Sequence, residues 1–365
     1  MQKPIYKRIA VKVGSNVLTR HDGTLNLTRM SALADQIAAL RHMGIQVILI
    51  SSGAVAAGRS ELRSRAAELH HLDSVDQRQL YSAIGQAKLI NHYYSLFREQ
   101  GIQVGQVLTT KESFATRQHY LNQRNCIQVM LQNGVLPIVN ENDTVSVTEL
   151  MFTDNDELSG LVATMMQADA LIILSNVDGI YTGNPSDAGT QLITRVEQGE
   201  DLSAYITSQK SGFGRGGMHT KCAIAQKVAE EGVEVIIASG TRPDVLLQLT
   251  DPSQSIPCTR FVPATAGVSG VKKWIAHSQG FAKGRVYIDD RAVKALSTQG
   301  AVSLLPVGVC RVEGDFQKDD LISLCDMQGN SIGVGRAAYD AREATRLIGQ
   351  HDCKPLVHYD YLYLE

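Results

Sequence analysis

The stretch RIAVKVGSN, residues 8–16, decides the fold class of this 365-residue chain. A short run rich in apolar residues ends abruptly at a glycine and two polar residues. Four further runs follow the same pattern: IQVILI (45–50), VLPIV (135–139), ALIILS (170–175) and VEVIIAS (233–239). Helical patterns lie between several of them, and near-continuous apolar strands that alternate with helices are typical of a parallel sheet covered on both faces. We therefore predict an α/β fold.

The composition excludes several classes of protein. Hydrophobic residues make up 44% and charged residues 20%, which argues against disorder. The formal net charge of −2 gives no overall basic balance that would indicate nucleic acid. The six cysteines lie far apart with no CxxC pair, so neither a metal site nor a small disulfide scaffold is indicated. With no signal-peptide pattern and no apolar run long enough for a membrane span, we expect a soluble cytoplasmic protein.

The local composition of the sequence changes from about residue 251, where Pro, Ser, Thr and Gly become frequent. Short apolar runs at tight spacing then follow, separated by turn signals such as Gln328-Gly329-Asn330. This pattern indicates a small, mainly β domain. We predict a larger domain at 1–260, a linker at 261–280 and the small domain at 281–365.

Polar and glycine-rich loops follow the five predicted strands. In a parallel α/β sheet these loops meet at one edge, which is where ligands bind. Each has a structural alternative: SSG before a helix is also an N-cap signal, and NEND is also an ordinary turn. FTDNDELSG (152–160) could likewise cap a helix, and its spacing departs from a calcium loop. Taken singly, these loops leave both interpretations open.

Lys12 is harder to explain as structure alone. It lies within the first strand, with Val11 and Val13 on the opposite face and Gly14 behind it. An unpaired buried ammonium group is very costly, so Lys12 must meet a negative charge from the protein or from a ligand. We interpret it as functional.

The stretch SGFGRGGMHTK (211–221) leads into a helical pattern with Lys221 in its first turn. It is no Walker loop, because Met218 stands where that motif needs its lysine. Glycines before a helix N-terminus form an anion site, since free N–H groups and the positive end of the helix dipole point outward. The alternative is a surface loop with an incidental lysine. Together, two lysines, glycine turns and a group of carboxylates and amides indicate phosphoryl transfer.

The ordered motifs resemble the amino acid kinase family. They are VKVGSNVL, LISSGAVAAGR, IGQAKL, VGQVLTT, PIVNENDTV, FTDNDELSG, LSNVDGIYTGNP and GFGRGGMHTK. The region from KGRVYIDD onward is similar to the PUA domain. The resemblance implies a three-layer sandwich with a mainly parallel sheet, followed by a small, mainly β PUA-like domain. It also implies transfer of the γ-phosphoryl group of ATP to the side-chain carboxylate of L-glutamate, which opens proline biosynthesis.

Carried over by motif, the resemblance assigns Lys12 and Lys221 to the transferring phosphoryl group and Asp156 to orienting them. The residues implied for the glutamate pocket are Ser52, Gly53, Asn140, Asp143 and Asn155. Those implied for ATP are Lys12, Gly14, Ser175, Asn176, Arg215, Gly216, Gly217, Met218, His219, Thr220 and Lys221. Magnesium would accompany ATP, and no protein ligand for it is named. Asn176 and Arg215 depart from the residues usual in the family, which bears on nucleotide affinity.

The resemblance further implies a homo-oligomer, dimer or tetramer, with proline as a feedback inhibitor and functional coupling to a glutamyl phosphate reductase. The alternatives within the family are kinases for carbamate, aspartate, acetylglutamate and uridylate. An alternative from another class is an RNA-binding protein, because PUA-like domains often bind RNA. The mixed basic and acidic residues of the C-terminal region show no clear phosphate-tracking stripe. We therefore expect RNA not to be the main partner.

Overall fold

The computed structural model describes residues 5–115, 117–146, 152, 155–184, 187, 189–202, 205, 218–264, 282–298, 302–351 and 353–364. The chain divides into two compact units, one of residues 1–110 with 124–267 and one of residues 111–123 with 268–365. Of the predicted ATP-binding residues, Arg215, Gly216 and Gly217 lie outside the described residues, as does most of the predicted linker at 261–280.

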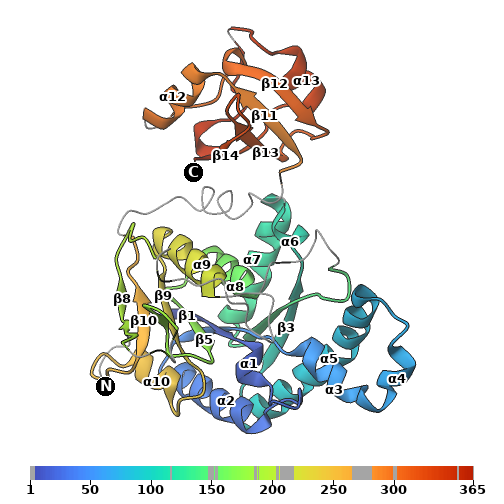
Figure 1. Ribbon diagram of the computed structural model, residues 1–365, viewed down its shortest axis with the longest axis vertical. Helices are drawn as coiled ribbons and strands as arrows, with labels where there is room; N and C mark the ends of the chain where they lie inside the picture. The colour runs from blue at the N-terminus through green and yellow to red at the C-terminus, as the bar shows by residue number, and fades with distance from the viewer. Residues whose placement is uncertain are drawn as a thin grey trace. The chain divides into compact units, whose positions relative to one another are not determined.

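An eight-stranded sheet forms the centre of the first unit (Figure 1). Its strands are β1 (Arg8–Val13), β2 (Gln46–Ile50), β3 (Val104–Thr109), β4 (Leu136–Glu141), β5 (Ala170–Ser175), β8 (Arg195–Val196), β9 (Glu234–Ser239) and β10 (Cys258–Phe261). The order across the sheet is β3-β4-β2-β1-β5-β9-β10-β8. The first six of these strands are parallel, and β10 runs antiparallel to β9. The predicted, mainly parallel α/β sheet is confirmed.

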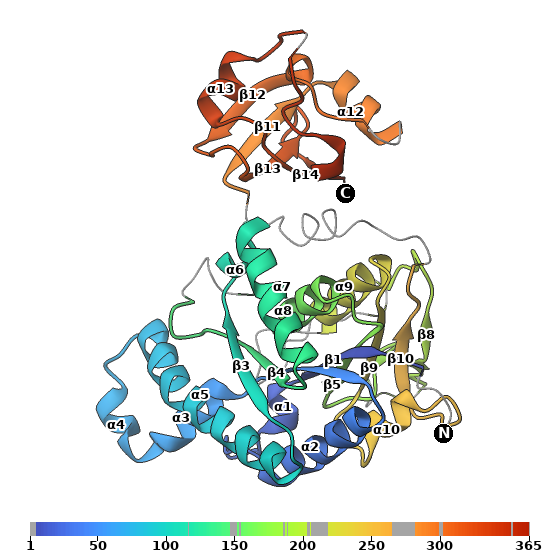
Figure 2. The ribbon, with the colours of Figure 1, turned by 180° about the vertical axis from the view of Figure 1, so that it is seen from behind.

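Helices cover both faces of this sheet, as Figures 1 and 2 show. The helices on one face are α1 (Ser15–Leu18), α2 (Leu27–His42), α3 (Ala54–Glu61), α5 (Ser74–Glu99) and α10 (Val245–Thr250). The helices on the other face are α7 (Arg117–Gln132), α8 (Asn155–Met165) and α9 (Met218–Glu230). Ile9, Val11 and Val13 pack into the core with α2, α5 and α10. Because strand side chains alternate, Lys12 points to the face of α8 and α9.

The remaining elements of the chain up to residue 264 are short. They are η1 (Arg63–Arg65), α4 (Ala66–Leu69), α6 (Glu112–Ala115), β6 (Ile180–Tyr181) and β7 (Leu192–Ile193), of which the last two form a small antiparallel pair. The longest helix, α5, begins with an N-cap at Asp73, whose carboxylate accepts the backbone N–H groups of Val75 and Asp76. No helix in the part of the chain that is described is both long and apolar enough to cross a membrane.

The second unit contains a five-stranded sheet of order β12-β11-β13-β14-β15. Its elements from residue 282 onward are β11 (Gly284–Ile288), α12 (Asp290–Thr298), η4 (Pro306–Gly308), β12 (Val309–Gly314), β13 (Leu321–Cys325), β14 (Ser331–Arg336), α13 (Ala341–Arg346), η5 (Tyr359–Tyr361) and β15 (Leu362–Leu364). The core includes Val286, Phe316 and Leu324. The predicted mainly β character of this region is confirmed.

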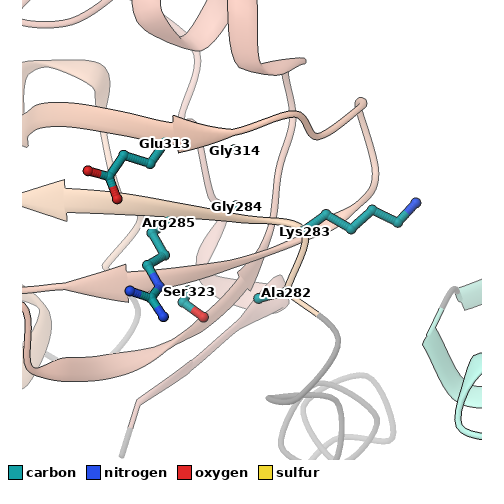
Figure 3. Close-up of a pocket in the computed structure, with 7 residues that line it drawn as sticks. All are labelled: Ala282, Lys283, Gly284, Arg285, Glu313, Gly314 and Ser323. Atoms are coloured by element: carbon teal, nitrogen blue, oxygen red, sulfur yellow. The ribbon is translucent and has the colours of Figure 1, made fainter. Parts of the chain in front are cut away.

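The second unit has a pocket of about 410 Å³ at one end of β11 (Figure 3). Lys283, Arg285, Glu313 and Ser323 lie around it, and Lys283 pairs with Asp320 at 3.1 Å. Both signs of charge therefore occur at this pocket, rather than a continuous basic surface.

Two glycines let α3 and α5 approach each other until their backbones touch. A Cβ atom at Gly85 would lie 1.8 Å from the carbonyl oxygen of Ala54, and one at Gly58 would lie 1.8 Å from that of Tyr81. Real Cβ atoms do not approach so closely, so only glycine fits at either position. This contact fixes α5 against α3, and both helices contribute to the site described below: Gly53 caps α3, and side chains of α5 bind Asn140 and Thr144.

We predict that Gly85→Ala lowers the free energy of unfolding by at least about 2 kcal/mol, because the added methyl group meets backbone that no rotamer change can move. Chemical denaturation measures this change. The matched control is Gly183→Ala, whose Cβ would meet only Thr190 Oγ1 at 3.2 Å. We expect it to cost less than about 1 kcal/mol. A Gly85→Ala protein as stable as the wild type would contradict the close helix contact.

Candidate active site

The carboxyl ends of the parallel strands line up at one edge of the sheet. Lys12 on β1 lies level with Ile50 on β2 and Ile173 on β5, and Ile50 lies level with Val139 on β4. The chain runs from β1 to one side of the sheet through β2 and later returns to β5 on the other side. Strand β1 is therefore the point where the strand order reverses, and ligands bind at such a point in open α/β sheets.

A single carboxylate joins two lysines at this point. Asp156 Oδ1 lies 2.5 Å from Lys12 Nζ, and Asp156 Oδ2 lies 2.7 Å from Lys221 Nζ. The side chains are 1%, 7% and 15% exposed, respectively. Three elements supply them: Asp156 is the second residue of α8, Lys12 lies in β1, and Lys221 lies in the first turn of α9. The structure thus brings together all three residues predicted to be catalytic.

The charge of Asp156 is set by two opposing effects. Burial raises the pKa of its carboxyl group, but the attraction of Lys12 and Lys221 outweighs burial and holds the pKa below its usual value. Its place in the first turn of α8 also favours a negative charge, because the N-terminus of a helix carries partial positive charge. Two ammonium groups are therefore held near each other by one ionised carboxylate, an arrangement suited to binding a polyanion.

Gly14 lets the chain pass close to this cluster. Its N–H donates to the carbonyl of Leu174 on β5 at 3.1 Å. A Cβ atom here would lie 3.2 Å from that carbonyl oxygen and 3.7 Å from Lys12 Nζ. A Cβ atom at position 14 would therefore press on the carbonyl oxygen of Leu174, whereas its contact with the lysine would be an ordinary one.

On the side of β2 and β4, amides and a hydroxyl group form a connected network. Asn155 Nδ2 donates to the carbonyl of Ser51 at 3.0 Å, to Ser52 Oγ at 2.9 Å and to Asn140 Oδ1 at 3.1 Å. Gly53 follows as the N-cap of α3, and its φ of +99° is a conformation that L side chains rarely adopt. The predicted glutamate-pocket residues Ser52, Gly53, Asn140 and Asn155 thus lie together, and Asn155 directly precedes Asp156 in the chain.

Asp143, the remaining residue predicted for this pocket, pairs with a residue that the sequence analysis missed. Arg78 Nη2, on α5, contacts Asp143 Oδ1 closely and lies 3.5 Å from Glu141 Oε2. Sequence spacing offers no signal for Arg78, because it lies on an ordinary polar face of a long helix and 65 residues before Asp143.

On the side of β5 and β9, the structure places those predicted ATP residues that it describes at the same strand edge. Ser175 ends β5, and its Oγ donates to Asn176 Oδ1 at 3.3 Å. Met218, His219 and Thr220 form the first turn of α9, directly before Lys221. Arg242, after β9, makes a bidentate ion pair with Asp178, after β5, at 2.7 and 2.9 Å. This pair was not predicted, and it ties together the two loops that bound this side.

The described residues of this site form no cluster of metal ligands. Nowhere in the described part of the chain do three His, Cys, Asp or Glu side chains gather as metal ligands. Asp156, the buried carboxylate nearest the centre, is already paired with two lysines.

Comparison with known proteins places this chain in a family. The profile of the Amino acid kinase family matches residues 7–239, and that of the PUA domain matches residues 284–359. The chain belongs to the amino acid kinase family and carries a PUA domain. It is 62% identical over 363 residues to a glutamate 5-kinase of Bacteroides thetaiotaomicron, covering 100% of both chains. It is 47% identical to a glutamate 5-kinase of Chlorobaculum tepidum, covering 100% of this chain and 99% of the relative.

We predict that Asp156→Asn lowers the free energy of unfolding by roughly 3 kcal/mol at pH 7, because it leaves two poorly solvated ammonium groups without their counter-ion. The pKa of Asp156 in the folded protein lies below its unfolded value of about 3.9. Its contribution is therefore complete above that unfolded value and is lost as the pH falls through the folded-state pKa. Urea denaturation from pH 7 to pH 3 should show the gap between wild type and variant closing in acid.

The control for this prediction is Glu61→Gln, which removes an ion pair with Lys88 whose side chains are 50% and 39% exposed. Exposed pairs contribute little, so we expect a change of less than about 1 kcal/mol. A gap between wild type and Asp156→Asn that stays constant down to pH 3 would contradict the assigned charge state of Asp156.

Proposed function

We propose that this protein transfers the γ-phosphoryl group of ATP to the side-chain carboxylate of L-glutamate, yielding ADP and L-glutamyl 5-phosphate, the first step of proline biosynthesis. The observation that carries the proposal is the Lys12–Asp156–Lys221 cluster. It lies between the amide network on one side and the strand ends of β5 and β9 on the other. The full-length similarity to glutamate 5-kinases supports glutamate over the other substrates of the family.

The chemistry fits a site without a general base. A glutamate side chain has an unperturbed pKa of about 4.3, so the attacking carboxylate is already ionised at neutral pH. The main obstacle is repulsion between an anionic acceptor and a polyanionic donor. Lys12 and Lys221 would lie on either side of the transferring group and stabilise the charge on its oxygens. Asp156 would keep both ammonium groups at a fixed spacing before substrates arrive.

Each substrate has a set of residues in this proposal. Asn155, Asn140 and Ser52 would bind glutamate through hydrogen bonds, and Gly53 would let the backbone approach it. The carboxylate of Asp143 would accept hydrogen bonds from the α-ammonium group of glutamate. The residues proposed for ATP are Gly14, Ser175, Asn176, Met218, His219 and Thr220, together with Arg215, Gly216 and Gly217 from the undescribed segment. The amide of Asn176 contributes hydrogen bonds without adding a negative charge beside the nucleotide.

Magnesium fits this site as an ion carried by ATP. The described residues present cationic groups rather than a carboxylate cage, and Mg²⁺ commonly binds through substrate phosphates with few protein ligands. When bound, it would neutralise charge on the phosphate oxygens. Lys12 and Lys221 would supply the remaining positive charge from the protein.

Regulation and partners extend the same proposal. Proline, an amino acid without the side-chain carboxylate, would compete at the glutamate pocket, with Asp143 and Asn155 as its contacts. In this proposal the protein is a cytoplasmic homo-oligomer. It passes its unstable acyl phosphate to a glutamyl phosphate reductase. RNA has no role in it as a main partner.

We predict that MgATP, L-glutamate and hydroxylamine yield glutamate-dependent hydroxamate, which traps the acyl phosphate. Lys12→Ala and Lys221→Ala should each lower kcat by about 10²–10³-fold or more, because each removes a group that stabilises transition-state charge. Colorimetric hydroxamate formation and ADP release measure this.

The matched control is Lys88→Ala, which removes an exposed lysine on α5 and should leave kcat within about twofold. Reactions without glutamate, or with aspartate in its place, report the background. Hydroxamate formed from aspartate but not from glutamate would overturn the assignment of glutamate as the substrate. Turnover retained in both lysine variants would overturn the mechanism.

A further inference from the structure

Side chains from one helix hold the loop that follows β4. From α5, Arg78 contacts Glu141 and Asp143, and Gln79 Nε2 donates to the carbonyl of Thr144 at 2.7 Å. Two turns further along α5, Gln86 Oε1 accepts a hydrogen bond from Asn140 Nδ2 at 2.8 Å. The helical spacing of these residues places them on one face of α5, and their partners run from the end of β4 into the loop that follows it. The position of this part of the glutamate pocket is thus set from α5.

Arg78 contacts the carboxylate of Glu141, which is more deeply buried than the Arg78 side chain. The side chain of Glu141 is 1% exposed, while those of Arg78 and Asp143 are 18% and 10% exposed. Glu141 Oε1 also accepts the backbone N–H of Phe152 at 2.9 Å, which fixes its orientation. A buried carboxylate needs a close cation, so Glu141 holds the guanidinium group in place even when Asp143 turns to another partner.

We propose that Arg78 determines substrate specificity by binding the α-carboxylate of the amino acid while Asp143 binds its α-ammonium group. This rests on the proposed function and assigns to the same site a residue that recognises the amino-acid end of its substrate. Arg78 and Asp143 present opposite charges in direct contact, at the partly exposed margin of the pocket.

The charges of this pair complement those of a zwitterion. The α-ammonium and α-carboxylate groups sit on one carbon atom, so the protein groups that bind them must also be neighbours. A guanidinium group binds a carboxylate through well-directed N–H donors. When the substrate enters, Asp143 exchanges one cationic partner for another, and Arg78 keeps Glu141 as its counter-ion while it gains the substrate carboxylate. No charge is left buried without a partner in either state.

Two analogues of glutamate separate these roles. 4-Aminobutyrate lacks the α-carboxylate and keeps the amine, whereas glutarate lacks the amine and keeps both terminal carboxylates. The experiment measures KM for L-glutamate and for MgATP, and the inhibition constants of both analogues against L-glutamate, in the full-length wild type and in Arg78→Gln. ADP release supplies the rate.

We predict that 4-aminobutyrate binds the wild type at least about 10-fold more weakly than L-glutamate. Arg78→Gln should raise KM for L-glutamate by roughly 10–100-fold, since a hydrogen bond to a charged group is worth about 1.5–3 kcal/mol. It should leave KM for MgATP and the inhibition constant of 4-aminobutyrate within about twofold. Arg78→Lys, which keeps the charge, should recover part of the glutamate affinity.

Two results would overturn the assignment of Arg78. One is 4-aminobutyrate binding the wild type as tightly as L-glutamate. The other is Arg78→Gln weakening both ligands by the same factor, which would make Arg78 a purely structural support for the loop. A wild type that does not phosphorylate L-glutamate would instead overturn the proposed function, before any variant is compared.

Two further variants complete the design. Asp143→Asn should weaken 4-aminobutyrate and leave glutarate within about twofold, the reverse selectivity of Arg78→Gln. Arg65→Gln is the matched control, because Arg65 forms an ion pair with Glu68 in which both side chains are more than half exposed. Thermal unfolding of each variant checks that its fold is retained.

Discussion

The site is built around the buried carboxylate of Asp156, because its two ion pairs make two neighbouring ammonium groups compatible with a folded interior. Lys12 lies in β1, Lys221 lies in α9, and Asp156 itself lies in α8, so one side chain links three elements. Removing two ammonium groups from water is costly unless each is paired. Asp156 pairs with both ammonium groups in the absence of substrate, and the two ammonium groups can also interact with a polyanion that approaches them.

The topology explains why two different ligand chemistries meet at this point. On one side of β1 the strand ends carry amides, a hydroxyl group and a carboxylate, which suit an amino acid. On the other side they carry Ser175, Asn176 and the beginning of α9, which suit a nucleotide. Because β1 lies where the strand order reverses, the lysine that it carries faces both sets. The fold thus provides the alignment that transfer between two bound groups requires.

Much of this arrangement could be predicted from the sequence, and the exceptions have physical reasons. Lys12 is evident because a charged residue interrupts an apolar strand, and Lys221 because it follows a glycine-rich entry to a helix. The sheet-edge strand β3 is harder to recognise, since Gly105 and Gln106 interrupt its apolar character. Arg78 could not be predicted from spacing at all, because its role depends on a contact that only the folded chain creates. The Asp178–Arg242 pair is another contact of this kind, formed between loops after separate strands.

The glycine contact between α3 and α5 also bears on how the proposed glutamate pocket moves. Ser52 and Gly53 lead directly into α3, while side chains of α5 bind the end of β4 and the loop after it. Helices whose backbones touch at Gly58 and Gly85 cannot slide or separate without losing that contact. Local opening is therefore expected to involve both helices together, as one cooperative unit in amide hydrogen exchange. The two walls of the proposed pocket then keep their spacing during such fluctuations, so an amino acid bound there would meet a preformed receptor rather than one that must be assembled around it.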